Sequence, residues 1–373
     1  MKVISFEVTG LFGKQPVINL QLNNDMNILT GRNGAGKTSV MKLMWYIASG
    51  NIEFAISEIN FSKAILVTDK YTCTVFKINK NTCKVELLYA DGTLMIFEDI
   101  HDEEADVFTS AEEGANSELI DIGSSVFLPT FRRIEGGFSL KPLRSLFQRM
   151  SRNKNEVEEG LTALSKKLSN GDHIFVTSIS STDIVDILLR KYADLSQTSN
   201  DYQQNTSLEI IERIRAYEDS AENTAPNRAN EVLSEVKKKV ESIEKMRSDI
   251  MSPMEELRIV VEKLFKHVGI RIDARVSFGD AASAVHSDEL SAGEKQMLSF
   301  LCYNAFYSNS VVFIDEPELS LHVDWQRQLF TILHRQNPTN QFIIATHSPF
   351  IYSKYPNKEL SLDSDRGDSE QEE

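Results

Sequence analysis

The sequence predicts an α/β fold: a mixed sheet with an N-terminal antiparallel β subdomain, interrupted by a helical insertion. Three observations lead to this prediction. Apolar and polar residues alternate in short segments over residues 1–100, as they do in half-buried antiparallel strands. Near the C-terminus, VVFI (311–314) is a continuous apolar run of the kind that a parallel sheet buries. Between these regions, residues 139–268 change to a helical pattern.

The composition is that of a globular protein. The chain has 373 residues, of which 41% are hydrophobic and 25% charged, so it can bury a large core. A net charge of −15 argues against a broad nucleic-acid-binding surface, although a local basic groove is compatible with it. The three cysteines lack CxxC spacing and fit a reducing compartment. No run of about 18 apolar residues exists, so we expect a cytoplasmic protein without a membrane span.

The first hundred residues also contain a glycine-rich loop. MNILT (26–30) predicts a strand that leads directly into GRNGAGKT (31–38), and SVMKLMWYIASG follows with helical spacing. Strand, loop and helix in this order are the context that a phosphate-binding P-loop requires. Four later segments, AILVTD, YTCTVFKI, KVELLYA and TLMIFED, predict a β-meander, and the acidic stretch from His101 to Glu118 predicts a surface loop.

The P-loop predicts nucleotide binding. Its backbone N–H groups and the following helix N-terminus can surround phosphates, and its glycines let the backbone turn and approach closely. Lys37 would neutralise the β- and γ-phosphates, and the Thr38 hydroxyl would bind Mg²⁺. The expected contacts with ATP are Arg32, Asn33, Gly34, Ala35, Gly36, Lys37, Thr38 and Ser39.

An acidic pair ends the strand VVFID (311–315). Asp315 would hold Mg²⁺ directly or through water, and Glu316 would orient and deprotonate the attacking water as the catalytic base. By itself such a pair could simply cap a strand at a solvent edge. Together with the P-loop and with LSAGEKQ (290–296), it predicts an ATPase that converts ATP and water to ADP and phosphate.

The segment LSAGEKQ predicts a second subunit. A helix beginning near Gly293 would point its N-terminus, with Ser291 and Glu294, at an anion. In the expected fold this end cannot reach the P-loop of its own chain, so it would bind the γ-phosphate held by a partner subunit. The alternative is an N-capping serine that binds nothing.

Two histidines follow the acidic pair. His347 comes directly after the expected strand NQFIIATHS (340–348), where its ring could contact the γ-phosphate. The alternative is a loop histidine with ordinary partners. For His322 and Glu318 two roles remain open: pairing between the two ATP sites across a dimer, or helix capping.

The insertion predicts a short helical hairpin. Leu233, Val236, Val240, Ile243 and Ile250 stand near heptad spacing over about three heptads, with Arg247 at the intervening position. Pro226 and Pro253 are expected to bracket this helix. The same insertion contains a basic stretch from Lys141 to Lys154, and a further strand is expected at RIDARVSF (271–278).

Five motifs together resemble the ABC-type ATPase heads of the OLD-like, AAA15-type class found in bacterial anti-phage defence: GRNGAGKT, FLPTFRRIEGG, LSAGEKQ, FIDEPELSLHVDWQ and IIATHSP. The sequence is most similar to the AriA subunit of PARIS and next to PtuA of Septu, over residues 1–138 and 270–350. The resemblance implies an ATP-bound homodimer and is compatible with its assembly into a larger ring. It also implies a sensor or scaffold that holds a separate nuclease or toxin effector until a phage protein triggers its release.

The resemblance also suggests the domain boundaries. We expect an N-terminal ATPase lobe at 1–138, a helical insertion at 139–269, a C-terminal ATPase lobe at 270–356 and a disordered acidic tail at 357–373. OLD nucleases continue into a nuclease domain, for which this chain leaves no room after His347, so no nuclease activity is expected in it. PTFRRIE stands where many relatives have a metal-contacting glutamine, and Arg132, Arg133 and Glu135 are candidates for a related role.

Two other functions fit parts of the sequence. An ATP-gated DNA-binding clamp of the RecF/Rad50 type is motivated by the basic stretch, but the net charge and the short hairpin oppose it. A transporter ATPase subunit fits less well, because the N-terminal meander and the long insertion differ from the compact helical subdomain of such heads.

Overall fold

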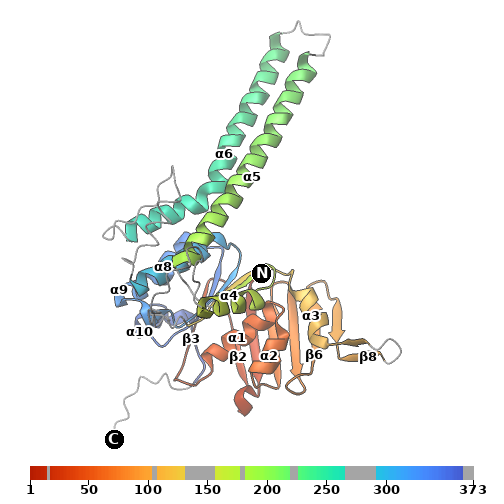
Figure 1. Ribbon diagram of the computed structural model, residues 1–373, viewed down its shortest axis with the longest axis vertical. Helices are drawn as coiled ribbons and strands as arrows, with labels where there is room; N and C mark the ends of the chain where they lie inside the picture. Colours follow the sequence, from red (N-terminus) through yellow and green to blue (C-terminus); the bar gives the residue numbers. More distant parts are fainter. Residues whose placement is uncertain are drawn as a thin grey trace, which may run out of the picture. The chain divides into compact units, whose positions relative to one another are not determined.

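The computed structural model describes residues 1–14, 17–102, 107–130, 156–176, 181–218, 226–264 and 291–363. The chain divides into two compact units (Figure 1). We call Met1–Ile179 with Ala292–Glu373 the head, and Ser180–Ser291 the hairpin unit. Among the described helices, none combines the length and the apolar character needed to span a bilayer.

An antiparallel sheet of six strands forms one layer of the head, in the order β2-β1-β4-β5-β6-β7. Side chains along these strands alternate between buried and partly exposed, as the period of two requires. This sheet contains the meander that the sequence predicts. Its strands are β1 Val3–Thr9, β2 Ile18–Gln21, β4 Lys63–Thr68, β5 Tyr71–Lys77, β6 Cys83–Tyr89 and β7 Leu94–Phe97.

A second sheet of six strands is entirely parallel, in the order β11-β10-β12-β13-β3-β14. Its central strands are buried on both faces, which accounts for their continuous apolar runs. The carboxyl ends of these strands meet at one edge, where the motifs follow. The strands are β3 Met26–Thr30, β10 Ser125–Leu128, β11 His173–Phe175, β12 Val311–Asp315, β13 Gln341–Ala345 and β14 Glu359–Ser361.

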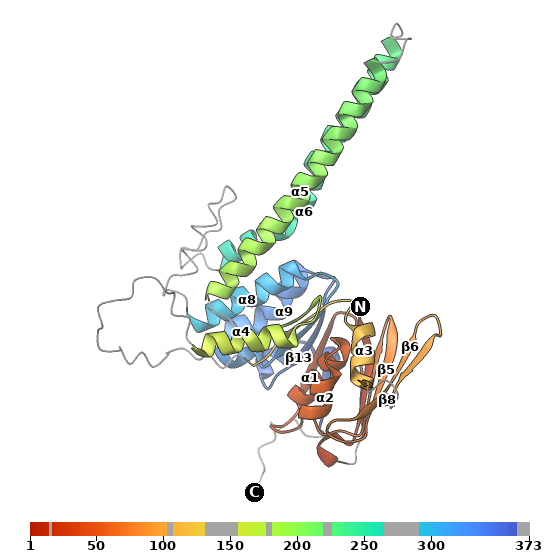
Figure 2. The same cartoon turned by 45° about the vertical axis from the view of Figure 1, so that its right-hand side comes forward.

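Helix α1 (Lys37–Ala48) lies between the two sheets, against β4 of one and β10, β12 and β13 of the other. Its Trp45 packs on Phe127 and Phe175, with ring centroids 5.5 and 5.1 Å apart. On the other face of the parallel sheet, Phe330 of α9 (Val323–Gln336) meets Phe342 of β13, and α8 (Ala292–Phe306) packs on α9. Figure 2 shows α1 and α9 on opposite sides of β13. The predicted α/β fold class is confirmed.

The stretch from His101 to Glu118, for which the sequence predicted a surface loop, instead contains a helix. After the ribbon of β8 (Ile100–Asp102) and β9 (Val107–Thr109), α3 runs from Ala111 to Leu119. The Ser110 hydroxyl accepts a hydrogen bond from the Glu113 N–H and caps the helix. The prediction was wrong because acidic residues that suggest a solvated loop also favour a helix N-terminus.

The helical insertion begins later than residue 139. Helix α4 (Glu156–Leu168) and β11 belong to the head, where the Asn51 amide donates to the Leu168 carbonyl at 2.9 Å. The hairpin unit consists of α5 (Ser181–Glu218) and α6 (Pro226–Leu264), of 38 and 39 residues, which is longer than the sequence predicted. Pro226 opens α6, but Pro253 lies inside it, so the expectation that Pro253 ends the helix was wrong.

The segment after Tyr355 also differs from expectation. Within the predicted tail of 357–373, η3 (Pro356–Lys358) leads into β14, which pairs with β3. The Thr30 hydroxyl donates to the Glu359 carboxylate at 2.7 Å and fixes this pairing. The C-terminal lobe therefore extends beyond residue 356. Residues 364–373, the expected strand at 271–278 and the basic stretch from Lys141 to Lys154 lie outside the described residues.

Candidate functional site

The P-loop joins β3 to α1. Gly34 and Gly36 have φ values of +81° and +98°, which favour glycine. A Cβ on Gly36 would stand 3.1 Å from the ring of Phe12, a residue of η1 (Leu11–Gly13) that itself has a φ of +55°. The N-cap residue of α1 is Gly36, which has no side chain to accept a hydrogen bond from the first N–H groups of the helix. The loop thus has the form that a phosphate needs.

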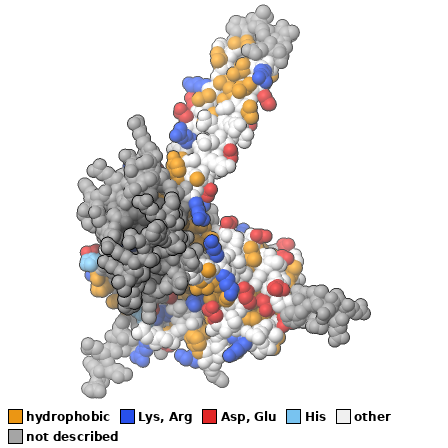
Figure 3. All heavy atoms as spheres, viewed as in Figure 1, with side chains coloured by type: hydrophobic (Ala, Val, Ile, Leu, Met, Phe, Trp, Pro, Cys, Tyr) orange, Lys and Arg blue, Asp and Glu red, His pale blue; other side chains and the backbone are white. Residues whose placement is uncertain are grey.

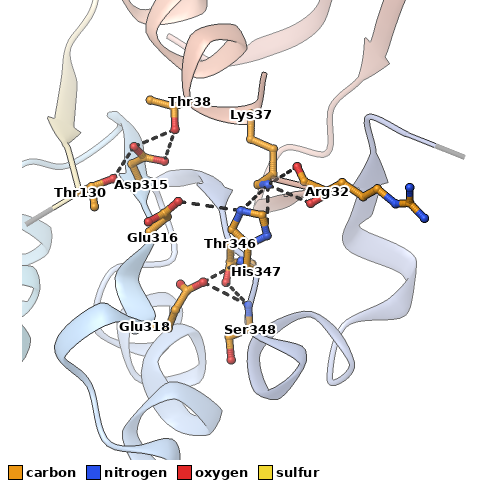
Figure 4. Close-up of polar contacts among 11 residues, drawn as sticks. Arg32, Lys37, Thr38, Thr130, Asp315, Glu316, Glu318, Thr346, His347 and Ser348 are labelled. Carbon is orange, nitrogen blue, oxygen red and sulfur yellow. Dashed lines mark hydrogen bonds and ion pairs between the residues drawn. The ribbon is translucent and has the colours of Figure 1, made fainter. Parts of the chain in front are cut away.

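Lys37 is buried, with 5% of its surface exposed. Its ammonium donates to the carbonyls of Gly31 at 2.9 Å and Arg32 at 3.3 Å, and it lies 2.7 Å from Nε2 of His347. Burial lowers the pKa of the Lys37 ammonium, and the negative charges of Glu316, Asp315 and Glu318 oppose that shift. The Arg32 side chain extends away from this cluster (Figure 4).

Asp315 ends β12 and is only 3% exposed. The Thr38 hydroxyl donates to its carboxylate at 3.0 Å, and the Thr130 hydroxyl donates to the same group at 2.7 Å (Figure 4). Burial raises the pKa of the Asp315 carboxyl, while both hydroxyls favour its ionised form. Threonine and carboxylate oxygens are ligands that Mg²⁺ accepts. The structure thus brings Thr38 and Asp315 into contact, and their role in holding Mg²⁺ stays a prediction.

Thr130 is a site residue that the sequence analysis missed. It follows β10, the neighbour of β12, and the register pairs Leu128 with Ile314. This register places the end of β10 beside Asp315, the last residue of β12, so that Thr130, two residues after β10, reaches the Asp315 carboxylate. Thr130 belongs to the PTFRRIE segment, of which Arg132, Arg133 and Glu135 lie outside the described residues. The sequence signal that could have identified Thr130 was its position shortly after a buried strand.

Glu316 follows Asp315 in a left-handed backbone conformation, with φ 46° and ψ 58°. Such a conformation costs a non-glycine residue about 1–3 kcal/mol and is found most often at functional sites. The Glu316 N–H donates to the Ala345 carbonyl at 2.8 Å, which ties the end of β12 to that of β13. The side chain is 26% exposed, and its carboxylate lies 3.9 Å from Nε2 of His347. It is thus accessible to a water molecule beside the P-loop.

His347 stands after β13 at the same edge of the sheet. Its ring lies between Lys37 and Glu316, and its backbone N–H donates to Oε1 of Glu318 at 2.6 Å (Figure 4). For the two residues with open roles, the structure places Glu318 on the backbone around His347. Nδ1 of His322 accepts from the Asp324 N–H at 3.4 Å and caps α9.

The signature residues stand at the start of α8. Ser291 precedes the helix and is exposed, and Glu294 lies in its first turn. A Cβ on Gly293 would collide with the carbonyl of Ser320, so glycine allows α8 to pack against η2 (Pro317–Ser320). Gly293 therefore has a packing role in its own chain. Its predicted contact with the nucleotide of a partner subunit stays a prediction, as do those of Ser291 and Glu294.

A model of the AAA_15 family, an AAA ATPase domain, matches residues 1–352. The chain belongs to this AAA ATPase family. The match covers both ends of the sequence and the region between them. Membership of this family agrees with the P-loop and the acidic pair described above. The AAA15-type class that the motifs resemble is thereby confirmed, and the closer likeness to AriA or PtuA stays a prediction.

Other similarities are more limited. A retron Vc95 probable ATPase from Vibrio cholerae serotype O1 biovar El Tor is 32% identical over 59 residues, which are 16% of this chain and 12% of that protein. One similar solved structure is the Smc head domain with an extended coiled coil bound to the C-terminal domain of ScpA, from Pyrococcus furiosus. The superposition covers 94% of this chain and 91% of that chain, with 12% sequence identity and a TM-score of 0.37. The SMC head domain from Thermotoga maritima covers 95% and 92%, with 11% identity and a TM-score of 0.35.

Proposed function

We propose that this protein is the ATP-hydrolysing sensor subunit of an anti-phage defence system and controls a separate nuclease or toxin effector. One observation carries the ATPase part of the proposal: Lys37, Asp315, Glu316 and His347 converge at the carboxyl edge of the parallel sheet. These residues come from three separate segments of the chain, and their types match what phosphoryl transfer to water requires.

Each residue of the site has a separate role in the proposed reaction. The P-loop N–H groups and the Lys37 ammonium bind the β- and γ-phosphates of ATP. Thr38 and Asp315 hold Mg²⁺, which neutralises phosphate charge when it is bound. Glu316 orients a water molecule and accepts its proton as the water oxygen attacks the γ-phosphorus; the bond to the β-phosphate breaks, and ADP and phosphate leave. His347 contacts the γ-phosphate and registers its loss.

We propose further that a second copy of the chain completes the site. The exposed Ser291 and the first turn of α8, with Gly293 and Glu294, would bind the γ-phosphate held by the partner subunit. Two such sites, related by a twofold axis, would link a homodimer only while ATP is bound. Larger rings could then be built from these dimers.

The defence role rests on the resemblance of the motifs and on the retron ATPase among the relatives. In this proposal a phage protein triggers the release of the effector, and the effector is a separate polypeptide. The basic stretch that motivated a DNA clamp lies outside the described residues, so this alternative stays an untested prediction.

Two experiments test the proposal. Purified protein should release phosphate from ATP, Lys37→Ala should lose ATP binding, and Glu316→Gln should bind ATP without hydrolysing it. The product of the neighbouring gene should then co-purify with Glu316→Gln in ATP and separate when a phage lysate is added. An ATPase that never binds its neighbour, or a neighbour that is harmless when expressed alone, would contradict the defence role and leave the ATPase assignment intact.

A further inference from the structure

Glu318 is a carboxylate near Lys37 to which the proposed reaction gives no role. It lies two residues after Glu316, in η2, and its side chain points at the segment Thr346–Ser348 (Figure 4). Oε1 accepts hydrogen bonds from two consecutive backbone N–H groups, that of His347 at 2.6 Å and that of Ser348 at 3.1 Å. Glu318 therefore holds the backbone on which the His347 ring is mounted.

The other carboxylate oxygen gives the same residue an energetic cost. Oε2 of Glu318 is buried and has no hydrogen-bond partner among the described residues. An unsatisfied buried acceptor loses its hydration without a replacement, which offsets much of what the two backbone hydrogen bonds contribute. Stability alone is thus a weak reason for a glutamate here. A role in positioning His347 accounts for it better.

A second link joins the same two segments. The Gln326 amide, on α9, donates to the carbonyls of Leu321 at 2.8 Å and Glu318 at 3.3 Å. Its oxygen accepts from the Ser348 hydroxyl at 2.7 Å. Gln326 therefore bridges the segment after Glu316 and the segment after β13, in parallel with Glu318. Two links in parallel resist a shift of one segment past the other.

We infer that Glu318 is a positioning residue that couples His347 to the segment 317–326. The inference rests on the proposed ATPase function. The His347 ring lies 2.7 Å from the Lys37 ammonium and 3.9 Å from the Glu316 carboxylate, so its place decides the geometry of both. A misplacement of about 1 Å can cost a reaction roughly 100-fold. When the γ-phosphate leaves, the same link transmits the change at His347 to residues 317–326.

The simpler alternative is that Glu318 only caps the short helix α10 (Pro349–Tyr352). The two roles predict different results. A cap that matters only for folding lowers the melting temperature and changes the affinities for ATP and ADP equally. A positioning residue changes the preference for ATP over ADP, because only ATP presents a γ-phosphate to His347.

The test compares Glu318→Ala and Glu318→Gln with a matched control. Glu118→Gln serves as the control, because Glu118 accepts a hydrogen bond from Tyr89 at 2.9 Å on α3, outside the site. The readouts are the affinities for ADP and for a non-hydrolysable ATP analogue, the melting temperature, and kcat with KM. We expect Glu318→Ala to lower the preference for the ATP analogue about 10-fold and kcat about 100-fold, with a smaller change in KM. Glu318→Gln keeps one acceptor oxygen, so its preference for the ATP analogue and its kcat should fall less than those of Glu318→Ala. If Glu318→Ala does not fold, the same measurements on Glu318→Gln provide the test.

A double-mutant cycle identifies the residue through which Glu318 acts. In a His347→Ala background, Glu318→Ala should have no further effect on the nucleotide preference, because the coupled group is already gone. Equal losses of ATP and ADP affinity, or a full additional loss in that background, would overturn the inference about Glu318 alone. A wild-type protein that does not bind ATP, or a Lys37→Ala variant with unchanged ATP affinity, would overturn the proposed function together with it.

Discussion

The head and the hairpin unit use charged residues in opposite ways. In the head, Lys37 and Asp315 are 5% and 3% exposed and are surrounded by specific partners. In the hairpin unit, Arg213 and Glu235 form a pair 2.7 Å apart but are 53% and 49% exposed. Burial makes a charge costly and strengthens its interactions, whereas water and salt screen an exposed pair. Lys37 and Asp315 therefore interact strongly with their surroundings, whereas the exposed Arg213–Glu235 pair has little energetic consequence.

Apolar residues show the same contrast. The strands of the parallel sheet are buried on both faces, while each long helix of the hairpin unit packs along the other and leaves apolar side chains exposed (Figure 3). Substitutions in the hairpin unit should thus be tolerated where similar changes in the head are not. Among its exposed apolar residues are Leu208, Ile211, Ile214, Leu233 and Val240.

The largest effect should come from Glu316 in the head. Replacing Glu316 by Gln removes the proton acceptor but keeps the shape, so kcat should fall about 1,000-fold while ATP still binds. Phosphate release and fluorescent-nucleotide binding measure the two quantities. A loss below about 10-fold would mean that another group accepts the proton.

A large effect on stability should come from His173 in β11. Burial lowers the pKa of His173 to about 4, from its ordinary value of 6.5, while Nδ1 lies 2.8 Å from the Ser125 hydroxyl. Between these two values the unfolded chain binds more protons than the folded one, so the free energy of unfolding falls as the pH is lowered from 6.5 to 4. The loss attributable to His173 should reach about 3 kcal/mol.

Chemical denaturation at several pH values measures this loss. The His173→Gln variant is the comparison, because other groups titrate in the same range. Its unfolding free energy should change less with pH than that of the wild type. If the unfolding free energies of the wild type and His173→Gln change with pH in parallel, His173 is protonated to the same extent in the folded and unfolded states.

A smaller effect should come from Thr130. Replacing Thr130 by Val removes the hydroxyl that donates to Asp315 at 2.7 Å, so the carboxylate loses one of its orienting hydrogen bonds. The Mg²⁺ concentration needed for half-maximal ATP binding should rise about 10-fold, as for other residues that orient a metal ligand. Thr130→Ser keeps the hydroxyl and should behave as the wild type does. If Thr130→Val and Thr130→Ser need the same Mg²⁺ concentration for half-maximal ATP binding, the Thr130 hydroxyl has no role in the site.

The smallest effect should come from the hairpin unit. Replacing Glu235 by Gln breaks its pair with Arg213, but both side chains are solvated. The ATPase rate should stay the same, and the melting temperature should change by about 1 °C or less. A shift above about 5 °C would mean that the contrast between the two units is wrong.

Much of the head could be predicted from the sequence because its signals are local. Glycine spacing between a strand and a helix identified the P-loop, and the apolar run before Asp315 identified β12. The roles of Thr130 and Glu318 could not be predicted in this way. Their contacts depend on which strands are neighbours and in which register, and both follow from the assembled sheet.

Other errors have a local origin. Helix α3 was missed because its acidic first turn resembles a solvated loop, and the buried Ala115 and Leu119 give only a weak period. Strands β11 and β14 have three residues each, too few for a pattern to show, and they are strands because they join the edges of the parallel sheet.

The central claim is that the buried cluster in the head forms an ATP site that a second copy completes. Light scattering on a sizing column, for the wild type and Glu316→Gln with and without Mg-ATP, tests it most directly. We predict a shift to a dimer or a larger ring only with ATP, and a more persistent shift in Glu316→Gln, because that variant keeps the γ-phosphate in place. A mass that ATP leaves unchanged in Glu316→Gln, while the nucleotide is demonstrably bound, would contradict the claim.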